Sequence, residues 1–435
     1  MSQTKSCTRV TIALSIAFVL VGLQPAHAEW PQWGGPDRNF TVDTSRLADQ
    51  WPEGGPKRLW HRPLGTGYSG IAVDDGVLYT MYRTEKKDTY EYTVALNAKT
   101  GKTLWKNKQM AAVPSETKDF GTRFTGPNAT PLVVGDRVYS IGRNAILHCF
   151  QKTDGKVLWK HALVEEFGAQ AESGGYSNSP IAYGKTISAP VGRVDADKSE
   201  GRSLIAFDQE SGEVVWKSQT FQIDHSSPIL ITLSGEEQLV QCTKKAVIGV
   251  DPKTGALIWE YKYPGSADDY SSIFATPVWN GKDTLFFSSG KLGCAIKLAK
   301  SKAGTSAAFR WSSKKTALGM GTPILMDDLL IGPKRGRVAL FLGVDIHTGK
   351  REWLKRLFPS STVLGGGGKL IVLDQEGQLA LVTATREDLT VVSQCQVTEK
   401  ESFTAPVLVG TTLYVRDEKN IMAYDLGSAP TRETS

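Results

Sequence analysis

The side chains that most often carry catalysis occur in this 435-residue sequence, but not at catalytic spacings. Beyond the first 28 residues the histidines are scattered, without HExxH or another spacing typical of metal ligands. They are His61, His148, His161, His225 and His347. No GxSxG motif surrounds a serine that would act as a nucleophile. The sequence therefore predicts no catalytic, cofactor-binding or metal-binding residue.

Two carboxylate pairs and one glycine run also resemble chemical sites. The pairs Asp74-Asp75 and Asp327-Asp328 each precede a strand-like segment, where turn capping is the expected role. The run Gly365 to Gly368 lacks the Lys-Ser/Thr and the helix that a phosphate loop requires. We interpret it as a flexible turn between strands.

The cysteines have no spacing typical of a metal or redox site. Cys149, Cys242, Cys294 and Cys395 lie far apart among apolar or strand-like neighbours. Export would permit disulfides. We nevertheless expect these residues to act as small buried hydrophobic side chains.

The N-terminus is typical of a signal peptide. Lys5 and Arg9 precede an apolar run at residues 10–22, and Ala26-His27-Ala28 gives a small-x-small cleavage pattern. The alternative is a membrane anchor, but this run is shorter than the roughly 20 apolar residues that span a bilayer. We predict cleavage after Ala28 and a periplasmic or extracellular protein that does not span the membrane.

The charge balance argues against nucleic acid as a partner. The net charge of +6 falls to +4 once Lys5 and Arg9 are removed with the first 28 residues. Basic clusters such as Lys334 to Arg337 are short and typical of solvated turns.

A turn-plus-strand unit recurs five times and organises the chain. In each copy, Gly stands four positions after a polar residue and Trp four positions after Gly; the copies are residues 97–105, 151–159, 208–216, 251–259 and 345–353. The polar residue can cap a tight turn, and Gly can adopt a positive φ. A Trp in a fixed position can bury about 150–250 Å² between units. We therefore predict structural roles for Trp60, Trp105, Trp159, Trp216, Trp259, Trp311 and Trp353.

Each unit reads as four short antiparallel strands introduced by a Gly/Ser/Thr-rich segment that usually ends in Pro. The fifth unit replaces its turn with an insertion at residues 298–308, and the seventh lacks both turn and Trp. The eighth stops before its Trp strand, and residues 56–60 supply one at the other end of the chain. The prediction is an all-β, eight-bladed propeller at 56–427, closed by an N-terminal strand that pairs with residues 413–425. Residues 29–55 would form an arm, and residues 428–435 a disordered tail.

The repeat resembles that of pyrroloquinoline-quinone (PQQ) type propellers over about residues 56–427. The opening Trp30-Pro-Gln-Trp33-Gly-Gly-Pro36 is similar to the start of secreted proteins grouped with the outer-membrane assembly factor BamB. This resemblance implies eight blades. It does not imply PQQ, because the adjacent cysteines and Ca²⁺ site of quinoprotein dehydrogenases have no counterpart here. The lipidation Cys of BamB is missing too.

These features favour a non-catalytic scaffold that binds a protein or cell-envelope partner as a monomer. The alternative is a PQQ- and Ca²⁺-dependent oxidoreductase that uses the central channel. A third possibility is glycan binding through Trp30, Trp33 and Trp51, although packing of the arm across the propeller is the simpler interpretation. The segments that lead into the innermost strands should gather at one mouth of the channel. Aromatic and charged residues there form the predicted recognition surface, unless they only plug the channel: Tyr68, Arg123, Phe124, Tyr176, His225 and Tyr270.

Overall fold

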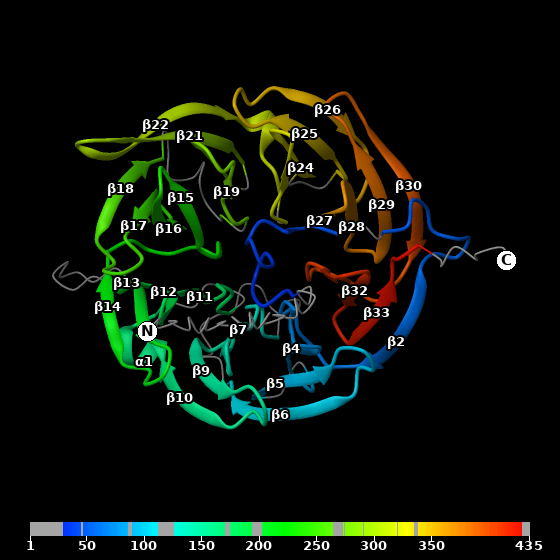
Figure 1. Cartoon of the computed structure of the whole chain (residues 1–435), viewed down its shortest axis with the longest axis horizontal. Helices are drawn as coiled ribbons and strands as arrows, with labels where there is room; N and C mark the ends of the chain where they lie inside the picture. Colours follow the sequence, from blue (N-terminus) through cyan, green and yellow to red (C-terminus); the bar gives the residue numbers. More distant parts are fainter. Residues whose placement is uncertain are drawn as a thin grey trace, which may run out of the picture.

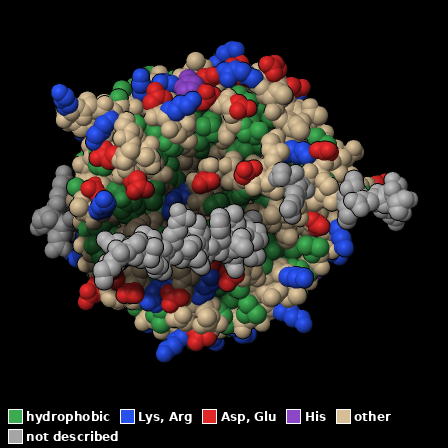
Figure 2. Space-filling model, viewed as in Figure 1, with side chains coloured by type: hydrophobic (Ala, Val, Ile, Leu, Met, Phe, Trp, Pro, Cys, Tyr) green, Lys and Arg blue, Asp and Glu red, His purple; other side chains and the backbone are tan. Residues whose placement is uncertain are grey.

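The chain folds into a closed ring of eight β-sheets (Figure 1). This computed structural model describes residues 29–44, 47–85, 89–111, 126–169, 175–193, 202–263, 273, 275–289, 291–319, 321–334 and 338–428. In the space-filling view the ring is hollowed near its centre (Figure 2). The predicted eight-bladed propeller is therefore confirmed.

The first four blades follow one another along the chain, and each contains four antiparallel strands. Blade 1 consists of β3 (Ala72–Asp74), β4 (Val77–Tyr82), β5 (Tyr90–Asn97) and β6 (Thr103–Met110). Blade 2 consists of β7 (Leu132–Val134), β8 (Arg137–Ile141), β9 (Ile146–Gln151) and β10 (Val157–Ala162). Blade 3 consists of β11 (Ile181–Tyr183), β12 (Thr186–Arg193), β13 (Arg202–Asp208) and β14 (Val214–Ser218). Blade 4 consists of β15 (Ile229–Leu233), β16 (Glu236–Cys242), β17 (Ala246–Val250) and β18 (Leu257–Lys262).

The other blades include the two that are modified by the N-terminal segment. Blade 5 consists of β19 (Val278–Trp279), β20 (Thr284–Ser288), β21 (Gly293–Ser301) and β22 (Gly304–Ser313). Blade 6 consists of β23 (Ile324–Met326), β24 (Leu329–Pro333), β25 (Phe341–Asp345) and β26 (Arg351–Lys355). Blade 7 consists of β27 (Thr362–Gly366), β28 (Lys369–Leu373), β29 (Gln378–Ala384) and β30 (Leu389–Gln396), with β1 (Thr41–Val42) added. Blade 8 consists of β31 (Val407–Val409), β32 (Thr412–Arg416), β33 (Asn420–Asp425) and β2 (Lys57–Pro63).

Among the described residues, helical structure is confined to two short connections. Helix α1 (Leu163–Phe167) follows β10, and a 3₁₀ turn (Lys314–Thr316) follows β22. Of the paired carboxylates, Asp75, Asp327 and Asp328 lie in turns with a positive φ between the first and second strands of their blades, whereas Asp74 is the last residue of β3 and pairs with Lys152. Cys149, Cys242 and Cys294 are buried, Cys395 is half-buried, and all four are free thiols.

The strand order gives the ring two different ends. The innermost strand of each blade starts at the end where the chain arrives from the preceding blade, and the second-to-third-strand connection lies there too. We call this end the linker face. The Gly-to-Trp turns lie at the opposite end, which we call the turn face. Of the predicted recognition residues, Tyr68, Tyr176 and His225 are described and belong to the linker face.

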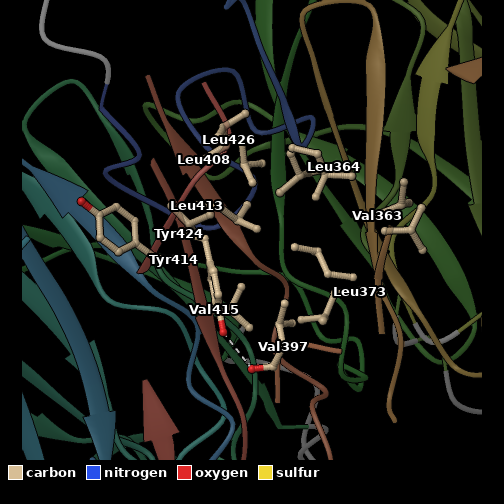
Figure 3. Packing of buried hydrophobic residues seen from close by; sticks show 14 of the residues in the cluster. Val363, Leu364, Leu373, Val397, Leu408, Leu413, Tyr414, Val415, Tyr424 and Leu426 are labelled. Carbon is tan, nitrogen blue, oxygen red and sulfur yellow. Dashed lines mark hydrogen bonds between the residues drawn. The ribbon is translucent and has the colours of Figure 1, made fainter. Parts of the chain in front are cut away.

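Ring closure depends on β2, the strand that precedes blade 1 in sequence. It pairs antiparallel with β33, with Lys57 opposite Asp425 and Pro63 opposite Asn420, which confirms the predicted closing strand. Apolar side chains of blades 7 and 8 pack against each other beside this strand pair (Figure 3). The Tyr424 hydroxyl also donates a hydrogen bond of 2.9 Å to the Val397 carbonyl (Figure 3).

The repeat tryptophans connect neighbouring blades. A Cβ added to Gly101 (φ +69°) would lie 2.8 Å from Cε3 of Trp60, so only glycine allows the indole to lie against the turn of the next blade. The indole N–H then donates to the carbonyl of the residue that follows the turn's polar position. The donor–acceptor pairs are Trp60–Ala98 (2.9 Å), Trp105–Lys152 (2.9 Å), Trp159–Gln209 (3.2 Å), Trp216–Pro252 (3.2 Å) and Trp311–Ile346 (2.8 Å).

Two tryptophans face blades without this turn and find other acceptors. Blade 5 has the insertion instead, which extends the β21–β22 hairpin beyond the ring (Figure 1). The indole N–H of Trp259 therefore donates to Oε1 of Gln238 in its own blade, at 2.7 Å. Trp353 faces blade 7 and donates to the Thr385 carbonyl at 3.0 Å.

A β-bulge occurs in the outermost strand of every blade. In blade 1, Ala95 pairs with Trp105 and Leu96 with Thr103, which leaves Leu104 unpaired. In the other seven blades, the residue before the tryptophan, or the residue at the equivalent position, is likewise left unpaired. Bulges twist and interrupt edge strands, so they protect the eight outer edges against pairing with another sheet.

The N-terminal arm, residues 29–55, crosses the centre of the ring (Figure 1). Its β1 pairs parallel with β27, with Thr41 opposite Gly365 and Val42 opposite Gly366. The prediction of one flexible turn at Gly365 to Gly368 is therefore wrong for its first half. A Cβ at Gly365 would lie 3.0 Å from Cγ2 of Thr41, so glycine there allows the close approach of the arm. Only Gly367 and Gly368 form the turn, both with positive φ.

Candidate functional site

The linker face holds three of the predicted recognition residues within the described part of the chain: Tyr68, Tyr176 and His225. The other three, Arg123, Phe124 and Tyr270, lie outside the described residues. Tyr68 leads into blade 1, Tyr176 into blade 3 and His225 into blade 4, because each stands shortly before the innermost strand of that blade.

The two tyrosines are packed into the wall of the channel. Tyr68 is 8% exposed, and its ring meets that of Phe403 edge-on at 5.5 Å. Tyr176 is 3% exposed, and its hydroxyl donates to the Pro190 carbonyl. Burial raises the pKa of Tyr176 well above its usual range. These contacts favour the packing role of both tyrosines over direct contact with a partner.

His225 lies at a small polar pocket between blades 3 and 4. Its Nδ1 is 3.0 Å from Oγ of Ser177, and its backbone N–H donates to Oδ1 of Asp224 at 2.9 Å. The other oxygen of buried Asp224 accepts the Ile273 N–H at 2.8 Å. Both carboxylate oxygens therefore accept backbone N–H groups, and Nε2 of the half-buried imidazole lies 3.9 Å from Oδ1 of Asp224. Ser177, Asn178 and Asp224 line the pocket together with His225.

A buried charge cluster lies between blades 1 and 2, close to the linker face. Nε of Arg83 is 3.6 Å from Oε1 of Glu91, and the backbone N–H of Arg143 donates to Oε2 of Glu91 at 2.9 Å. Burial raises the pKa of Glu91 to about 7, although the Arg143 N–H and the Arg83 charge oppose this shift. Burial also lowers the pKa of Arg143.

A further arginine joins the blades on either side of the closure. Arg416 is 1% exposed at the end of β32. Its Nη1 donates to the Ser69 carbonyl (3.1 Å), Oγ1 of Thr80 (2.9 Å) and the Met81 carbonyl (2.8 Å), all in or beside blade 1. Burial lowers the pKa of Arg416 to about 10. This side chain therefore supplements the strand pairing that closes the ring.

These arginines belong to a repeat that our reading of the sequence missed. In every blade except the seventh, a basic residue stands at the end of the second strand or within three positions after it. They are Arg83, Arg143, Arg193, Lys244, Lys291, Lys334 and Arg416. Alignment of the second strands, rather than of the Gly-to-Trp turns, would have found them. The topology places all seven positions at the linker face.

At the turn face the N-terminal arm occupies the axis of the ring. Trp30 forms an antiparallel bridge with Val73 of blade 1, and Nε1 of Trp33 donates to Oγ1 of Thr276 beside blade 5 at 2.8 Å. Phe40 meets Trp33 edge-on at 4.9 Å. Trp30 and Phe40 are each 2% exposed, so packing of the arm, rather than glycan display, is the role these contacts support.

The arm leaves a pocket of about 340 Å³ against blades 4 to 6. The arm contributes Asp37, Arg38 and Asn39. The opposite walls come from innermost strands and their turns, and include Ile229, Leu230, Pro277, Val278, Trp279, Asn280, Thr322 and Leu325. Hydrophobic side chains are visible in the central hollow of the ring (Figure 2). Its volume exceeds that of the pocket beside His225, which is about 10 Å³, and sequence reasoning did not predict it.

Among the positions that the structure describes, no three His, Cys, Asp or Glu side chains gather as metal ligands. The arm crosses the centre of the ring (Figure 1), and its Trp30 and Trp33 each contact Phe40 edge-on.

The closed ring of four-stranded blades and its Gly-to-Trp turns define a PQQ-type propeller. The sequence matches the family described as outer membrane protein assembly factor BamB over residues 91–355, which is more than half of the chain. The chain therefore belongs to this family. No curated protein matches the sequence significantly.

Solved structures show the same fold at low identity. Quinohemoprotein alcohol dehydrogenase ADHIIG from Pseudomonas putida HK5 is 14% identical with a TM-score of 0.62, over 94% of this chain and 82% of that one. The computationally designed Ika8 protein is 10% identical with a TM-score of 0.53, over 83% and 98%. BamB from Moraxella catarrhalis is 14% identical over 83% of this chain and 84% of that one, with a lower TM-score of 0.41. Within the described residues, no helix has the length and apolar character needed to cross a membrane.

Proposed function

We propose that this protein is a non-catalytic binding scaffold of the cell envelope, exported by a signal peptide at residues 1–28. The observation that carries the proposal is the N-terminal arm across the ring axis, tied to blade 1 through Trp30, to blade 5 through Trp33 and to blade 7 through Thr41. An axis filled by the chain's own residues leaves the rigid faces of the propeller as the surfaces for binding. Membership of a family named for outer-membrane protein assembly supports a protein as the partner.

The linker face is the surface we assign to this partner. Its loops differ from blade to blade, whereas the Gly-to-Trp turns of the opposite face are nearly uniform. Of the basic residues at the ends of the second strands, Lys244, Lys291 and Lys334 are half-buried or exposed. They support a partner with an acidic surface, because complementary charge speeds and orients association. Arg123, Phe124, His225 and Tyr270 are the proposed contacts, while Tyr68 and Tyr176 shape the surface from beneath.

Site-specific photo-crosslinking in the exporting cell tests this assignment. A photo-reactive residue at Arg123 or His225 should capture one discrete protein. The same residue at Thr254, exposed in a Gly-to-Trp turn, is the control and should capture none. Arg123→Ala and His225→Ala should then weaken capture at an unchanged melting temperature, whereas Lys253→Ala on the turn face should not. Equal capture from both faces, or capture unaffected by either linker-face variant, would refute the assignment.

A further inference from the structure

The pocket between the N-terminal arm and blades 4 to 6 combines an apolar body with hydrogen-bond donors. Ile229, Leu230, Val278 and Leu325 form apolar walls, and Trp279 adds an indole. A volume of about 340 Å³ is at the lower end of the range for small-molecule sites, which is roughly 300–1,000 Å³. These walls would take up an apolar group of modest size.

The donors at this pocket lack acceptors within the described part of the chain. Nε of Arg38 and Nδ2 of Asn280 are both buried atoms without a hydrogen-bond partner there. Arg38 has one long hydrogen bond, from Nη2 to the Ala182 carbonyl at 3.4 Å. Buried donors are normally paired, so two orphan donors at one pocket call for an acceptor.

The positive charge of Arg38 indicates which kind of group would accept from these donors. Arg38 carries a permanent positive charge, and a carboxylate can accept from a guanidinium and an amide N–H together. Asp37 and Glu237 are the acidic groups near Arg38, but neither forms an ion pair or hydrogen bond with it among the described residues. Asp37, which also lines the pocket, and Glu237 therefore act on the guanidinium through space and leave its N–H donors to other acceptors.

We infer that this pocket binds a small carboxylic acid with an apolar body, whose carboxylate accepts from Arg38 and Asn280 while the body lies against Trp279. The inference is independent of the proposed function, because the pocket lies by the turn face and the proposed partner surface is the linker face. The same chemistry could come from a free acid or from the C-terminal residue of a polypeptide. The pocket size favours the free acid.

A matched pair of fluorinated probes tests the charge requirement on the intact mature protein. In fluorine NMR, 4-fluorophenylacetate should shift and broaden on titration with the protein, and its uncharged amide should bind at least about tenfold more weakly. A short peptide that ends in phenylalanine should compete less well than the free acid if the source is a small molecule. Equal binding of acid and amide, or no binding of either at millimolar concentration, would overturn the inference.

Asn280→Asp is the sharpest variant. Oδ1 of Asn280 accepts the backbone N–H groups of Lys282, Asp283 and Thr284, and an aspartate keeps this acceptor. The change replaces only the orphan donor with an oxygen that repels the ligand, so affinity for the acid should fall about tenfold or more. Asn97→Asp is the control, since Oδ1 of Asn97 also accepts a backbone N–H, in a Gly-to-Trp turn of blade 1 that does not line the pocket. An Asn280→Asp protein that keeps the melting temperature and the affinity of the wild type would overturn the inference.

Discussion

Each repeat tryptophan except Trp259 joins two blades through its ring and one hydrogen bond. Trp105 belongs to blade 1, yet its N–H donates to the Lys152 carbonyl of blade 2, and its ring lies 6.0 Å from that of Phe150. The residue before it, Leu104, is the bulged residue and is 53% exposed. Neighbouring positions in one strand therefore differ sharply in what they contribute to stability.

Trp105→Ala should lower the free energy of unfolding by roughly 3–5 kcal/mol, because it removes a buried ring and leaves a cavity between blades. Leu104→Ala is the matched control and should change it by less than about 0.5 kcal/mol. Urea unfolding followed by circular dichroism measures both. Similar losses for the two variants would mean that the tryptophan does not join the blades.

His148 predicts an acid dependence of stability. It is 6% exposed on β9, stacks on Phe150 at 5.5 Å, and has no partner for Nδ1 among the described residues. Burial, then the charge of Lys160, lowers its pKa to about 4. A lowered pKa favours the folded state above the ordinary pKa near 6.5, and this contribution is lost as the pH falls towards 4.

Between pH 6.5 and pH 4, the free energy of unfolding of the wild type should therefore fall by up to about 3 kcal/mol more than that of His148→Leu. Urea unfolding at a series of pH values measures the difference between the two proteins. His61→Leu, at an exposed position of β2, is the control. If wild type and His148→Leu show the same pH profile, His148 is not buried in its neutral form.

For single residues, the sequence predicts the place of a residue in the repeat better than the side chains that surround it. The spacing of Trp105 from Gly101 indicates a repeated packing residue, because a local turn determines where the ring lies. The burial of Tyr68 could not be predicted in the same way. It depends on Phe403, more than 300 positions away, and only the closed ring brings the two together. The sequence likewise could not predict that Asn280 of blade 5 lines one pocket with Arg38 of the arm.

Among the elements, β1 and β2 were not equally predictable. The strand β2 carries Leu59-Trp60, so the repeat itself identifies it as the missing strand of blade 8. The two-residue β1 has no periodicity, and its parallel pairing with β27 depends on the glycines at 365 and 366. A strand of two residues that pairs through its backbone alone has no alternation of apolar residues from which it could be predicted.

Two deletions separate the roles of β2 and the arm. Removal of residues 29–62 takes away both, exposes the edge of β33, and should cause aggregation and a large fall in melting temperature. Removal of residues 29–55 alone keeps β2, so the ring should remain closed and monomeric, with a smaller loss of stability. Light scattering and thermal unfolding measure both. A melting temperature unchanged by the longer deletion would refute closure by β2.

In the whole molecule, the two ends of the ring differ because the arm lies at only one of them. The turn face carries the arm, with Trp33 and Phe40 on the axis, and the pocket beside Arg38. The linker face carries the variable segments and the basic residues that end the second strands. A partner and a small ligand could then bind at the same time, one at each end.

Export should leave a protein that begins at Glu29. Trp30 is already tied to Val73 by two backbone hydrogen bonds of 2.8 Å, so the ordered arm starts directly after the predicted cleavage point. Mass spectrometry of the protein from the periplasm or medium measures the start. Ala26→Leu, a bulky change in the small-x-small pattern, should block cleavage, while Pro25→Ala serves as the control. A full-length chain recovered with the membrane would contradict the prediction.

The pairing of β2 with β33 also sets an order of events during biosynthesis. The strand β2, which ends at Pro63, is synthesised long before its partner, which starts at Asn420. Until β33 has been made, β2 cannot form the strand pair that closes the ring. The entropic cost of closing a loop grows only slowly with its length. The long separation of β2 from β33 therefore delays ring closure more than it lowers the stability of the closed ring. A chain cut short before β33 should therefore stay open and be more susceptible to proteolysis than the full ring.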